Sequence, residues 1–355
     1  MRSSWCHIAT GGLVAACLLG SQDAANRDGA IAELMRQAEA LRPLIETSAG
    51  QQLLDEVERL PAIDARTLWY RRDPRAALTD AQYQALPEAG REGFRQMDFD
   101  TRRYYETFYG TPLASLRAFD LAAAAGNYDT YEARRVLDIG YGSIGQLRLL
   151  AQRGSEAVGV EVDALLQALY SAPGDQGPVS VVRGRSGSVR LVHGFWPRDV
   201  VAEVGGGYDL IVSKNTLKKG YVTPDDPDPR NRGVDLGVSP AEYLKALADA
   251  LHPGGLVIIY NIGPGPGPDG RGVDESGEPT YVHMADIRCP FPREQWEAAG
   301  FEVVAMDRDD TEKVRSFARA FGWDDAARMG DSAMNLRDDL YAKYSIVRKR
   351  PPADR

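Results

Sequence analysis

The sequence predicts an α/β fold in which a mostly parallel sheet carries helices on both of its faces. From residue 136 onward, short apolar runs of strand length alternate with stretches of helical periodicity, which is typical of successive βαβ units. Several of these runs are nearly continuous in Val, Ile and Leu, as expected for strands that are buried on both faces. A glycine-rich loop joins the first run to the first helical stretch.

The first twenty residues have the composition of a targeting segment. A positive start at Arg2 precedes an uncharged apolar stretch at residues 8–20, which is too short to span a bilayer. This is the shape of a secretory signal peptide, predicted here for residues 1–20. Residues 14–17 also resemble the lipobox of bacterial lipoproteins, in which the cysteine, here Cys17, is lipidated. We therefore expect an exported protein, periplasmic or lipid-anchored to the envelope. The alternative is a cytoplasmic protein with a misassigned start.

The segment from residue 21 to residue 100 is predicted to be mainly helical. Residues 21–29 are small and polar and are interpreted as a tether. Helical spacing of apolar residues then predicts one helix at 30–45 and a second at 51–60, and Thr79 opens a third through a capping-box pattern. Since no reliable strand alternation occurs here, residues 30–100 are predicted to be a helical extension.

Residues 101–350 are predicted to form the α/β domain, followed by a tail at 351–355. The predicted strands are residues 136–139, 157–161, 189–193, 208–213, 256–260, 301–306 and 341–347. The predicted helices are residues 144–153, 164–170, 240–251, 292–299 and 313–321. Two long loops, at 223–237 and 263–279, interrupt the pattern, and such loops in a compact domain are usually functional or disordered.

Composition excludes several function classes. The chain has 355 residues, 43% of them hydrophobic and 26% charged, which is the balance of a soluble globular protein. A net charge of −9 argues against a dedicated nucleic-acid partner. The three cysteines and four histidines lack metal-ligand spacing, so no metal site is expected. We expect a small-molecule substrate, with membrane attachment only through a lipid anchor at Cys17.

The glycine loop indicates a nucleotide-like ligand. Gly140, Gly142 and Gly145 form a G-x-G-x-x-G pattern between a strand and a helix, where free backbone N–H groups can meet a ligand. Glu161 ends the next strand, 21 residues after the first glycine, and could accept both ribose hydroxyls. These residues fit NAD and S-adenosylmethionine (SAM) equally well.

Asp138 separates the two ligands. It lies two residues before the first glycine, where a carboxylate would repel a pyrophosphate. SAM has no phosphate and carries an ammonium and a sulfonium, which a carboxylate attracts. The position therefore favours SAM over a dinucleotide.

Four segments resemble motifs of the class I SAM-dependent methyltransferases. Residues 136–145, VLDIGYGSIG, resemble motif I, and residues 158–163, 206–217 and 247–259 resemble the motifs of the second, fourth and fifth strands. The resemblance covers about residues 100–350. It implies a Rossmann-like, seven-stranded, mostly parallel sheet, SAM as the cofactor and methyl transfer as the activity.

The resemblance also implies roles for individual cofactor-binding residues. Gly140, Gly142 and Gly145 would line the methionine part, Asp138 would orient the amino group, and Glu161 would hold the ribose hydroxyls. Further cofactor contacts are expected from Tyr141, Val162 and Ser213, from Tyr109 closing over the cofactor, and from Phe195 or Trp196 stacking on adenine.

The catalytic expectations come from the fourth strand and from the region after the fifth. The fourth strand would present Lys214 and Asn215 to the reacting methyl group. Methyl transfer depends mainly on positioning, and a general base matters only for an acceptor that carries a proton. His283 is the candidate base, and Asp286 and Arg288 could contact substrate. No NPPY motif is present, so the acceptor class is not identified; we expect a small molecule or an envelope component.

The prediction from the N-terminus and the prediction from the glycine loop conflict, because SAM is a cytoplasmic metabolite and the N-terminus predicts export. Three alternatives to an exported or misassigned methyltransferase stay open. One is a non-catalytic ligand-binding lipoprotein on the same fold. Another is an NAD(P)-dependent oxidoreductase, for which Asp138 is hard to explain. The third is an aminopropyltransferase-like enzyme, which would need an acid pair for a polyamine.

Overall fold

The computed structural model describes residues 21–351 except 108–109, 181–183, 227–232 and 275. The expected signal peptide and Cys17 lie outside this range, so export and lipidation stay predictions. In the part of the chain that is described, no helix is long and apolar enough to cross a membrane.

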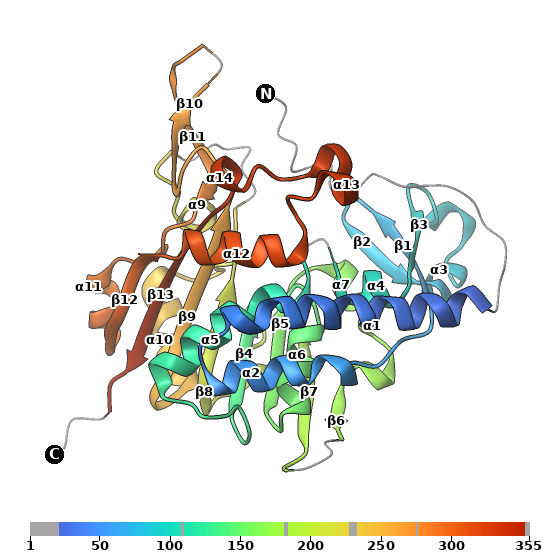
Figure 1. Ribbon diagram of the computed structural model, residues 1–355, viewed down its shortest axis with the longest axis horizontal. Helices are drawn as coiled ribbons and strands as arrows, with labels where there is room; N and C mark the ends of the chain where they lie inside the picture. Colours follow the sequence, from blue (N-terminus) through green and yellow to red (C-terminus); the bar gives the residue numbers. More distant parts are fainter. Residues whose placement is uncertain (1–20, 108–109, 181–183, 227–232, 275, 352–355) are drawn as a thin grey trace.

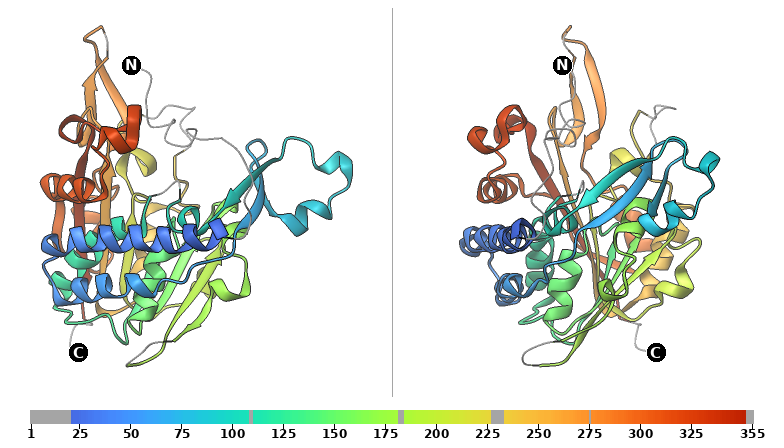
Figure 2. Two further views of the ribbon diagram at one scale, coloured as in Figure 1. Left: turned by 45° about the vertical axis from the view of Figure 1, so that its right-hand side comes forward. Right: turned by 90° about the vertical axis from the view of Figure 1, so that its right-hand side faces the viewer.

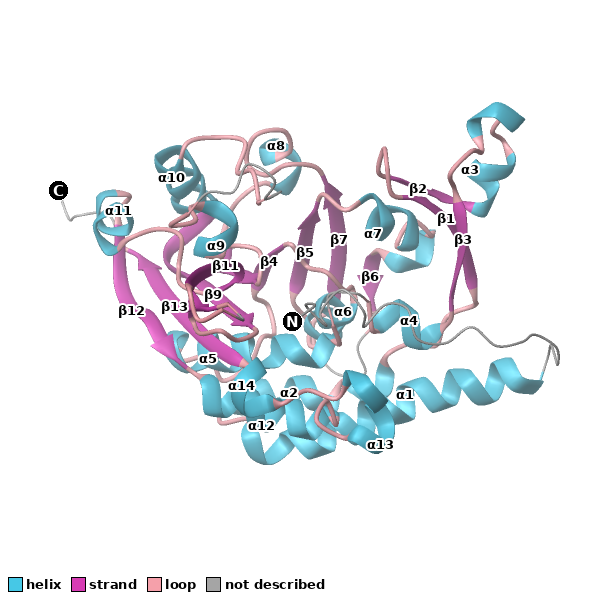
Figure 3. Ribbon diagram, turned by 90° about the horizontal axis from the view of Figure 1, so that it is seen from above, coloured by secondary structure: helices cyan, strands magenta, loops and turns pink. Residues whose placement is uncertain are grey.

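The central sheet is the predicted Rossmann-like one, with an eighth strand added. Its order is β12-β13-β9-β8-β4-β5-β7-β6 (Figure 3). The strands are β4 (Arg135–Ile139), β5 (Glu156–Glu161), β6 (Gly177–Val179), β7 (Gly187–His193), β8 (Tyr208–Lys214), β9 (Leu251–Gly263), β12 (Phe301–Asp309) and β13 (Tyr341–Lys349). The middle strands are parallel, while β13 runs antiparallel to both of its neighbours and β6 antiparallel to β7. All seven predicted strands are present. The sequence missed β6, a three-residue edge strand that contains Pro178.

Helices cover both faces of the sheet, as predicted (Figure 2). Two separate apolar clusters, one on each face, form the core. The first face carries α1 (Ser21–Leu41), α2 (Ser48–Asp55), α5 (Leu116–Gly126), α6 (Gly145–Gln152) and α12 (Thr311–Phe321). The second carries α8 (Val201–Val204), α10 (Pro240–Ala250) and α11 (Arg293–Ala298). Shorter helices are α3 (Asp80–Gln84), α4 (Thr101–Tyr105), α7 (Ala164–Leu169), α9 (Lys219–Val222), α13 (Ala326–Met329) and α14 (Leu336–Asp339).

The N-terminal extension is not purely helical, so that prediction was wrong. Three antiparallel strands, β1 (Arg66–Arg71), β2 (Ala76–Thr79) and β3 (Arg95–Phe99), form a small sheet that projects beside α7 (Figures 1 and 2). In β1 only Leu68 is buried and the other five residues are partly exposed, which explains why no alternation is visible in the sequence. The capping box at Thr79 is confirmed.

Residues 21–29 belong to α1 and do not form an irregular tether. The stretch contains no proline, so nothing in it prevents a helix. Once the rest of α1 is packed, each residue added to the helix gains one hydrogen bond. The tether prediction was wrong because it relied on small polar residues, which do not exclude a helix.

The long loop at 263–279 was also mispredicted, because most of it belongs to a β-hairpin. Strands β10 (Asp269–Val273) and β11 (Pro279–Asp286) pair antiparallel and project beyond the main sheet (Figure 1). The glycines and prolines of this segment predicted a loop. The strands form because β10 pairs with β11, and this pairing joins residues that are several positions apart in the sequence. The described residues of the other long loop, 223–226 and 233–237, contain no helix or strand.

Candidate functional site

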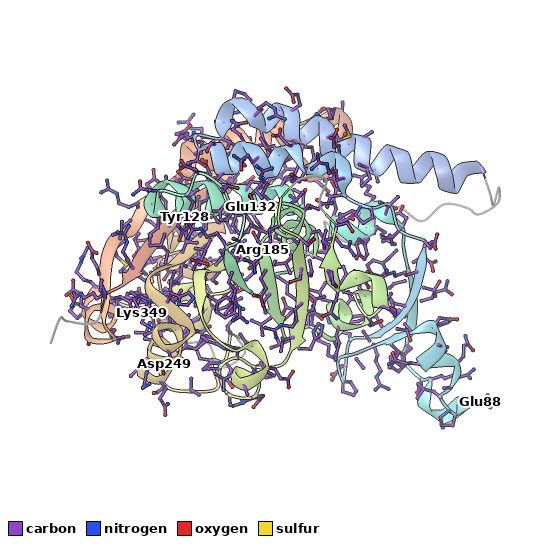
Figure 4. The ribbon with its side chains drawn as sticks, turned by 90° about the horizontal axis from the view of Figure 1, so that it is seen from below. Glu88, Tyr128, Glu132, Arg185, Asp249 and Lys349 are labelled. Carbon is purple, nitrogen blue, oxygen red and sulfur yellow. The ribbon has the colours of Figure 1, made fainter. Side chains whose placement is uncertain are left out.

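The candidate site lies where the parallel strands end. In β4, β5 and β8, Asp138, Glu161 and Lys214 are at the carboxyl ends, and parallel pairing brings these ends to one edge of the sheet. The strand order reverses between β4 and β8, and open α/β sheets bind ligands at such a point. Figure 4 shows the opposite edge, where Tyr128, Glu132 and Arg185 mark the starts of the strands.

Gly140 and Gly142 have the backbone conformation that the motif requires. Their φ angles are +71° and +60°, in the left-handed region. A Cβ at Gly140 would lie 2.0 Å from Oγ1 of Thr216, so a side chain would displace the loop after β8. The amide of Gly140 donates to the carbonyl of Val160 in β5 (2.9 Å), which fixes the loop to the neighbouring strand.

Gly145 has a packing role in this structure. A Cβ there would lie 2.6 Å from Cβ of Pro112, so the glycine lets α6 approach the segment that carries this proline. The contact of Gly145 with a cofactor stays a prediction. In dinucleotide-binding folds, the third glycine likewise allows the helix to pack closely against its neighbours.

Asp138 is a buried carboxylate with unused hydrogen-bonding capacity. It is 2% exposed, and its Oδ2 accepts from Nε2 of Gln146 (3.1 Å). Its Oδ1 has no partner among the described residues. Burial raises the pKa of Asp138 to about 6. A buried acceptor without a donor is rare in folded proteins, so the position suits a ligand that brings an N–H group.

Tyr141 and Gln146 complete the surroundings of Asp138. Nε2 of Gln146 also donates to the carbonyl of Tyr141 (2.5 Å). Tyr141 is 4% exposed, and its hydroxyl has no partner among the residues described. Gln146 was not predicted; its position in the first turn of α6, facing the strand acid, was the available signal.

Glu161 is held by its own turn. Its Oε1 accepts from the amides of Val162 (2.8 Å) and Asp163 (3.3 Å), and burial raises the pKa of the carboxyl. The backbone N–H of Gly142 also acts on this carboxylate, which links Glu161 to the glycine loop. Val162 is 55% exposed, so its side chain offers an apolar surface beside this acid.

The extension contacts the same strand end, which the sequence did not predict. Nη2 of Arg75, just before β2, donates to Oδ2 of Asp163 (2.6 Å). Asp163 also caps α7 through Oδ1 and the amide of Leu165 (2.9 Å). The small sheet is thereby fixed next to Glu161.

The segment ahead of the glycine loop is also fixed to it. Oγ1 of Thr107 donates to the carbonyl of Gly142 (2.7 Å), and Oγ of Ser143 donates to the carbonyl of Tyr105 (2.9 Å). Tyr109 lies outside the described residues, so its closing role stays a prediction. Thr107 and Ser143 were not predicted.

Of the two aromatic residues expected at the adenine, only Phe195 is accessible. It is 37% exposed, and its ring faces the guanidinium of Arg198 at 4.5 Å. Trp196 is 5% exposed and packs edge-to-face on Tyr243 of α10 (5.3 Å). Stacking by Trp196 is therefore excluded by its place in the second core cluster.

Two expected residues of the fourth strand are occupied by backbone contacts. Ser213 is fully buried, and its Oγ accepts from the amide of Leu217 (3.1 Å). Asn215 has a φ of +64°, and its Oδ1 accepts from the amide of Ile262 (2.7 Å), which joins β8 to β9. These contacts give both residues structural roles and leave no observation that supports catalysis by Asn215.

Lys214 and the unpredicted Lys218 remain as charged groups at this edge. Lys214 is half-buried; burial lowers its pKa, and the charge of Asp138 opposes that effect. Lys218 is 4% exposed and donates from Nζ to the carbonyl of Ile262. Burial, reinforced by the charge of Lys214, lowers the pKa of Lys218 to about 7. The sequence signal was a lysine pair directly after the fourth-strand motif.

His283, Asp286 and Arg288 belong to the hairpin rather than to the strand ends. His283 lies in β11, with its ring edge-to-face on Tyr281 (5.1 Å). Arg288 donates to Asp286 (2.7 Å from Nε) and to Asp225 (2.7 Å from Nη2), which fixes the base of the hairpin. Neither the base role of His283 nor a substrate contact of the other two has support in these contacts. No cluster of metal-ligating side chains occurs among the described residues.

Comparisons with known proteins give the following similarities. Ribosomal RNA small subunit methyltransferase C of Chromohalobacter salexigens is 26% identical over 273 residues, which cover 76% of this chain and 62% of that protein. The chain therefore spans less than two thirds of this relative. A SAM-dependent methyltransferase structure from Mesorhizobium loti is 14% identical, with a TM-score of 0.37 over 66% of this chain and 98% of its own. The [4+2]-cyclase SpnF is 17% identical, with a TM-score of 0.37 over 66% and 80%. No protein-family model matches the sequence.

Proposed function

We propose that this protein is a SAM-dependent methyltransferase. The observation that carries the proposal is Asp138, a buried carboxylate with a free oxygen directly before the glycine loop. Together with Glu161 on the next strand, it fits a ligand that has an ammonium group and a ribose. SAM meets both requirements, and when bound it supplies a methyl group activated on a sulfonium. Similarity to a methyltransferase relative supports the same assignment.

The chain's own residues would bind and orient the cofactor. Asp138 would accept from the amino group, Glu161 from the ribose hydroxyls, and the Gly140–Gly142 backbone would allow close approach. The contacts of Tyr105 and Thr107 with the glycine loop would hold that loop in place before binding. Positioning of the cofactor and the acceptor in this way would supply most of the rate acceleration of methyl transfer.

The main competing function is an NAD(P)-dependent oxidoreductase. A dinucleotide would place its pyrophosphate against the glycine loop. The carboxylate of Asp138, two residues before that loop, would repel the negative charge of the pyrophosphate. Calorimetric titration of the full-length protein with SAM, S-adenosylhomocysteine (SAH) and NADH separates the two. We expect micromolar binding of SAM and SAH and no heat with NADH. Binding of NADH alone would exclude the methyltransferase assignment.

For the acceptor, we propose a small molecule or an envelope component. The name of the sequence relative places its own acceptor in ribosomal RNA. The net charge of −9 favours a small acceptor here. For the compartment, we propose export through residues 1–20, with a cytoplasmic location as the alternative.

Binding of SAM should weaken below pH 6. The pKa of Asp138 is about 6, and only its ionised form attracts the cofactor's ammonium. Affinity should therefore be nearly constant well above pH 6, about halved at pH 6 and about tenfold below its high-pH value at pH 5, as protonation removes the carboxylate. Titration calorimetry across this range measures the effect.

The variant Asp138→Asn is the control for that pH dependence. Since the pKa of Glu161 is also raised, a slope that persists in Asp138→Asn would assign the titration to Glu161. We expect the variant to bind weakly and with little change between pH 5 and pH 7. An unchanged slope would contradict the role of Asp138.

A further inference from the structure

Two lysines lie at the candidate site, and the carboxylate of Asp138 acts on one of them, Lys214, without a direct ion pair. Lys214 ends β8, and Lys218 follows four residues later, beside the end of β9. Within the described residues, neither forms an ion pair with a carboxylate. Among the described residues, Lys218 donates one hydrogen bond, to the carbonyl of Ile262, and its Nζ lies 5.1 Å from the ring centroid of Tyr221. An ammonium has three donors, so two N–H groups of Lys218 remain for another partner.

Nearby lysines show the usual arrangement for comparison. Lys219 pairs with Asp225, and Lys245 pairs with Asp249 on the surface of α10. Lys218 is far more buried than either and yet lacks such a partner. A buried charge is costly unless it is paired, and burial without an acid lowers the pKa of Lys218 to about 7, so a bound anion would stabilise its ammonium form.

The backbone around Lys218 is rigidly held. Nδ2 of Asn261 donates to the carbonyls of Leu217 (2.8 Å) and Ile287 (3.1 Å), and Ser213 fixes the amide of Leu217. The side chain therefore starts from a fixed point at the edge of the sheet. A preorganised donor binds a partner at a lower entropic cost than a flexible one does.

Charge balance indicates what that partner is. Asp138 is the acid that acts on Lys214, and the proposed function assigns its free oxygen to the ammonium of SAM. A bound SAM would add an ammonium, a sulfonium and its own carboxylate to an edge that carries two lysines and the carboxylates of Asp138 and Glu161. An anionic group on the acceptor would balance the remaining positive charge, and no described carboxylate forms an ion pair with Lys218.

We propose that Lys214 and Lys218 form an oxyanion subsite, which holds a carboxylate or phosphate group of the methyl acceptor. The inference rests on the proposed function and names its substrate class as an anionic small molecule. The lysines bind and orient the acceptor, with Lys218 donating the N–H groups that its bond to Ile262 leaves free.

The test uses the full-length protein saturated with SAH. The midpoint of thermal unfolding is followed with sodium acetate, sodium phosphate, acetamide, and sodium chloride at matched ionic strength. We expect acetate or phosphate to raise the midpoint in a saturable way, and the uncharged acetamide to have no effect. The stronger of the two anions identifies the acceptor group. Equal responses to acetate, phosphate and chloride would overturn the proposal.

Variants locate the effect at these lysines. Lys218→Met should weaken anion binding at least tenfold while SAH affinity changes less than twofold. Lys214→Met should also weaken anion binding at least tenfold, but it removes a charge that favours ionised Asp138, so SAH affinity is read from Lys218→Met alone. Lys245→Met, which removes a surface lysine that has its own partner, should change neither. Undiminished anion binding in both site variants would refute the subsite. The comparison of acetate with acetamide uses the unaltered protein and stands even if a variant fails to fold.

The two levels of inference fail separately. SAH binding without a specific anion effect would retain the methyltransferase assignment and remove the subsite. Absence of SAH binding would contradict the proposed function and, with it, the acceptor subsite.

Discussion

Replacing Glu161 with glutamine should weaken the binding of SAM and SAH by about 100-fold. The carboxylate's Oε1 accepts from the amides of Val162 and Asp163, and a carboxylate has further lone pairs with which to accept from the ribose. Hydrogen bonds to a charged group contribute about 1.5–3 kcal/mol each, and glutamine puts an N–H donor where an acceptor is needed. SAM and SAH should lose affinity equally, since both carry the ribose. Titration calorimetry measures the loss.

Glu156→Gln is the matched control, because it changes a glutamate at the other end of the same strand. Its side chain is 50% exposed and pairs with Arg135 at 3.4 Å, away from the strand's carboxyl end. We expect unchanged binding in this variant. Glu161→Gln should also have an unfolding temperature close to that of the unaltered protein, since glutamine retains an oxygen that can accept hydrogen bonds from the two amides. Equal binding by Glu161→Gln and the unaltered protein would show that the ribose lies elsewhere.

The central sheet could be predicted because its signals are local. Strands buried on both faces are apolar throughout, and the positive φ angles of Gly140 and Gly142 require glycine. The extension and the β10–β11 hairpin lack such signals. Their strands are half-exposed, and their pairing depends on partners that no short window of sequence reveals.

The site could be predicted only in part, for a related reason. Sequence places Asp138 and Glu161 at strand ends, and the structure has them there, while their contacts with a cofactor stay predictions. Sequence cannot show that Oδ1 of Asn215 already accepts from Ile262, or that Trp196 is turned into the core. Nor can it show that Lys218 is buried without an acid, since that depends on side chains brought together by folding.

Replacing Arg117 with alanine should produce a large loss of stability. Arg117 is 6% exposed and donates to both oxygens of Asp310 (2.9 Å each) and to Asp120 (3.1 Å). Asp310 also accepts from the hydroxyl of Tyr260 (2.9 Å). Removing the cation leaves two carboxylates buried, which typically costs about 3–5 kcal/mol. The midpoint of thermal unfolding should fall by on the order of 10 °C.

The consequence should extend to the N-terminal helices. Oδ1 of Asp120 accepts from the amide (2.9 Å) and the hydroxyl (2.7 Å) of Thr47, the residue that caps α2. Arg117→Ala should therefore loosen α2 and α5 together, which faster amide hydrogen exchange in both helices would reveal. Arg293→Ala is the control, because it breaks an exposed pair with Glu297 at 3.4 Å and should cost less than about 0.5 kcal/mol. If both variants unfold at the same denaturant concentration, the buried network contributes no more than a surface ion pair. The extension would then be held to the domain by apolar packing and by its other polar contacts, such as the pair of Arg66 with Asp175.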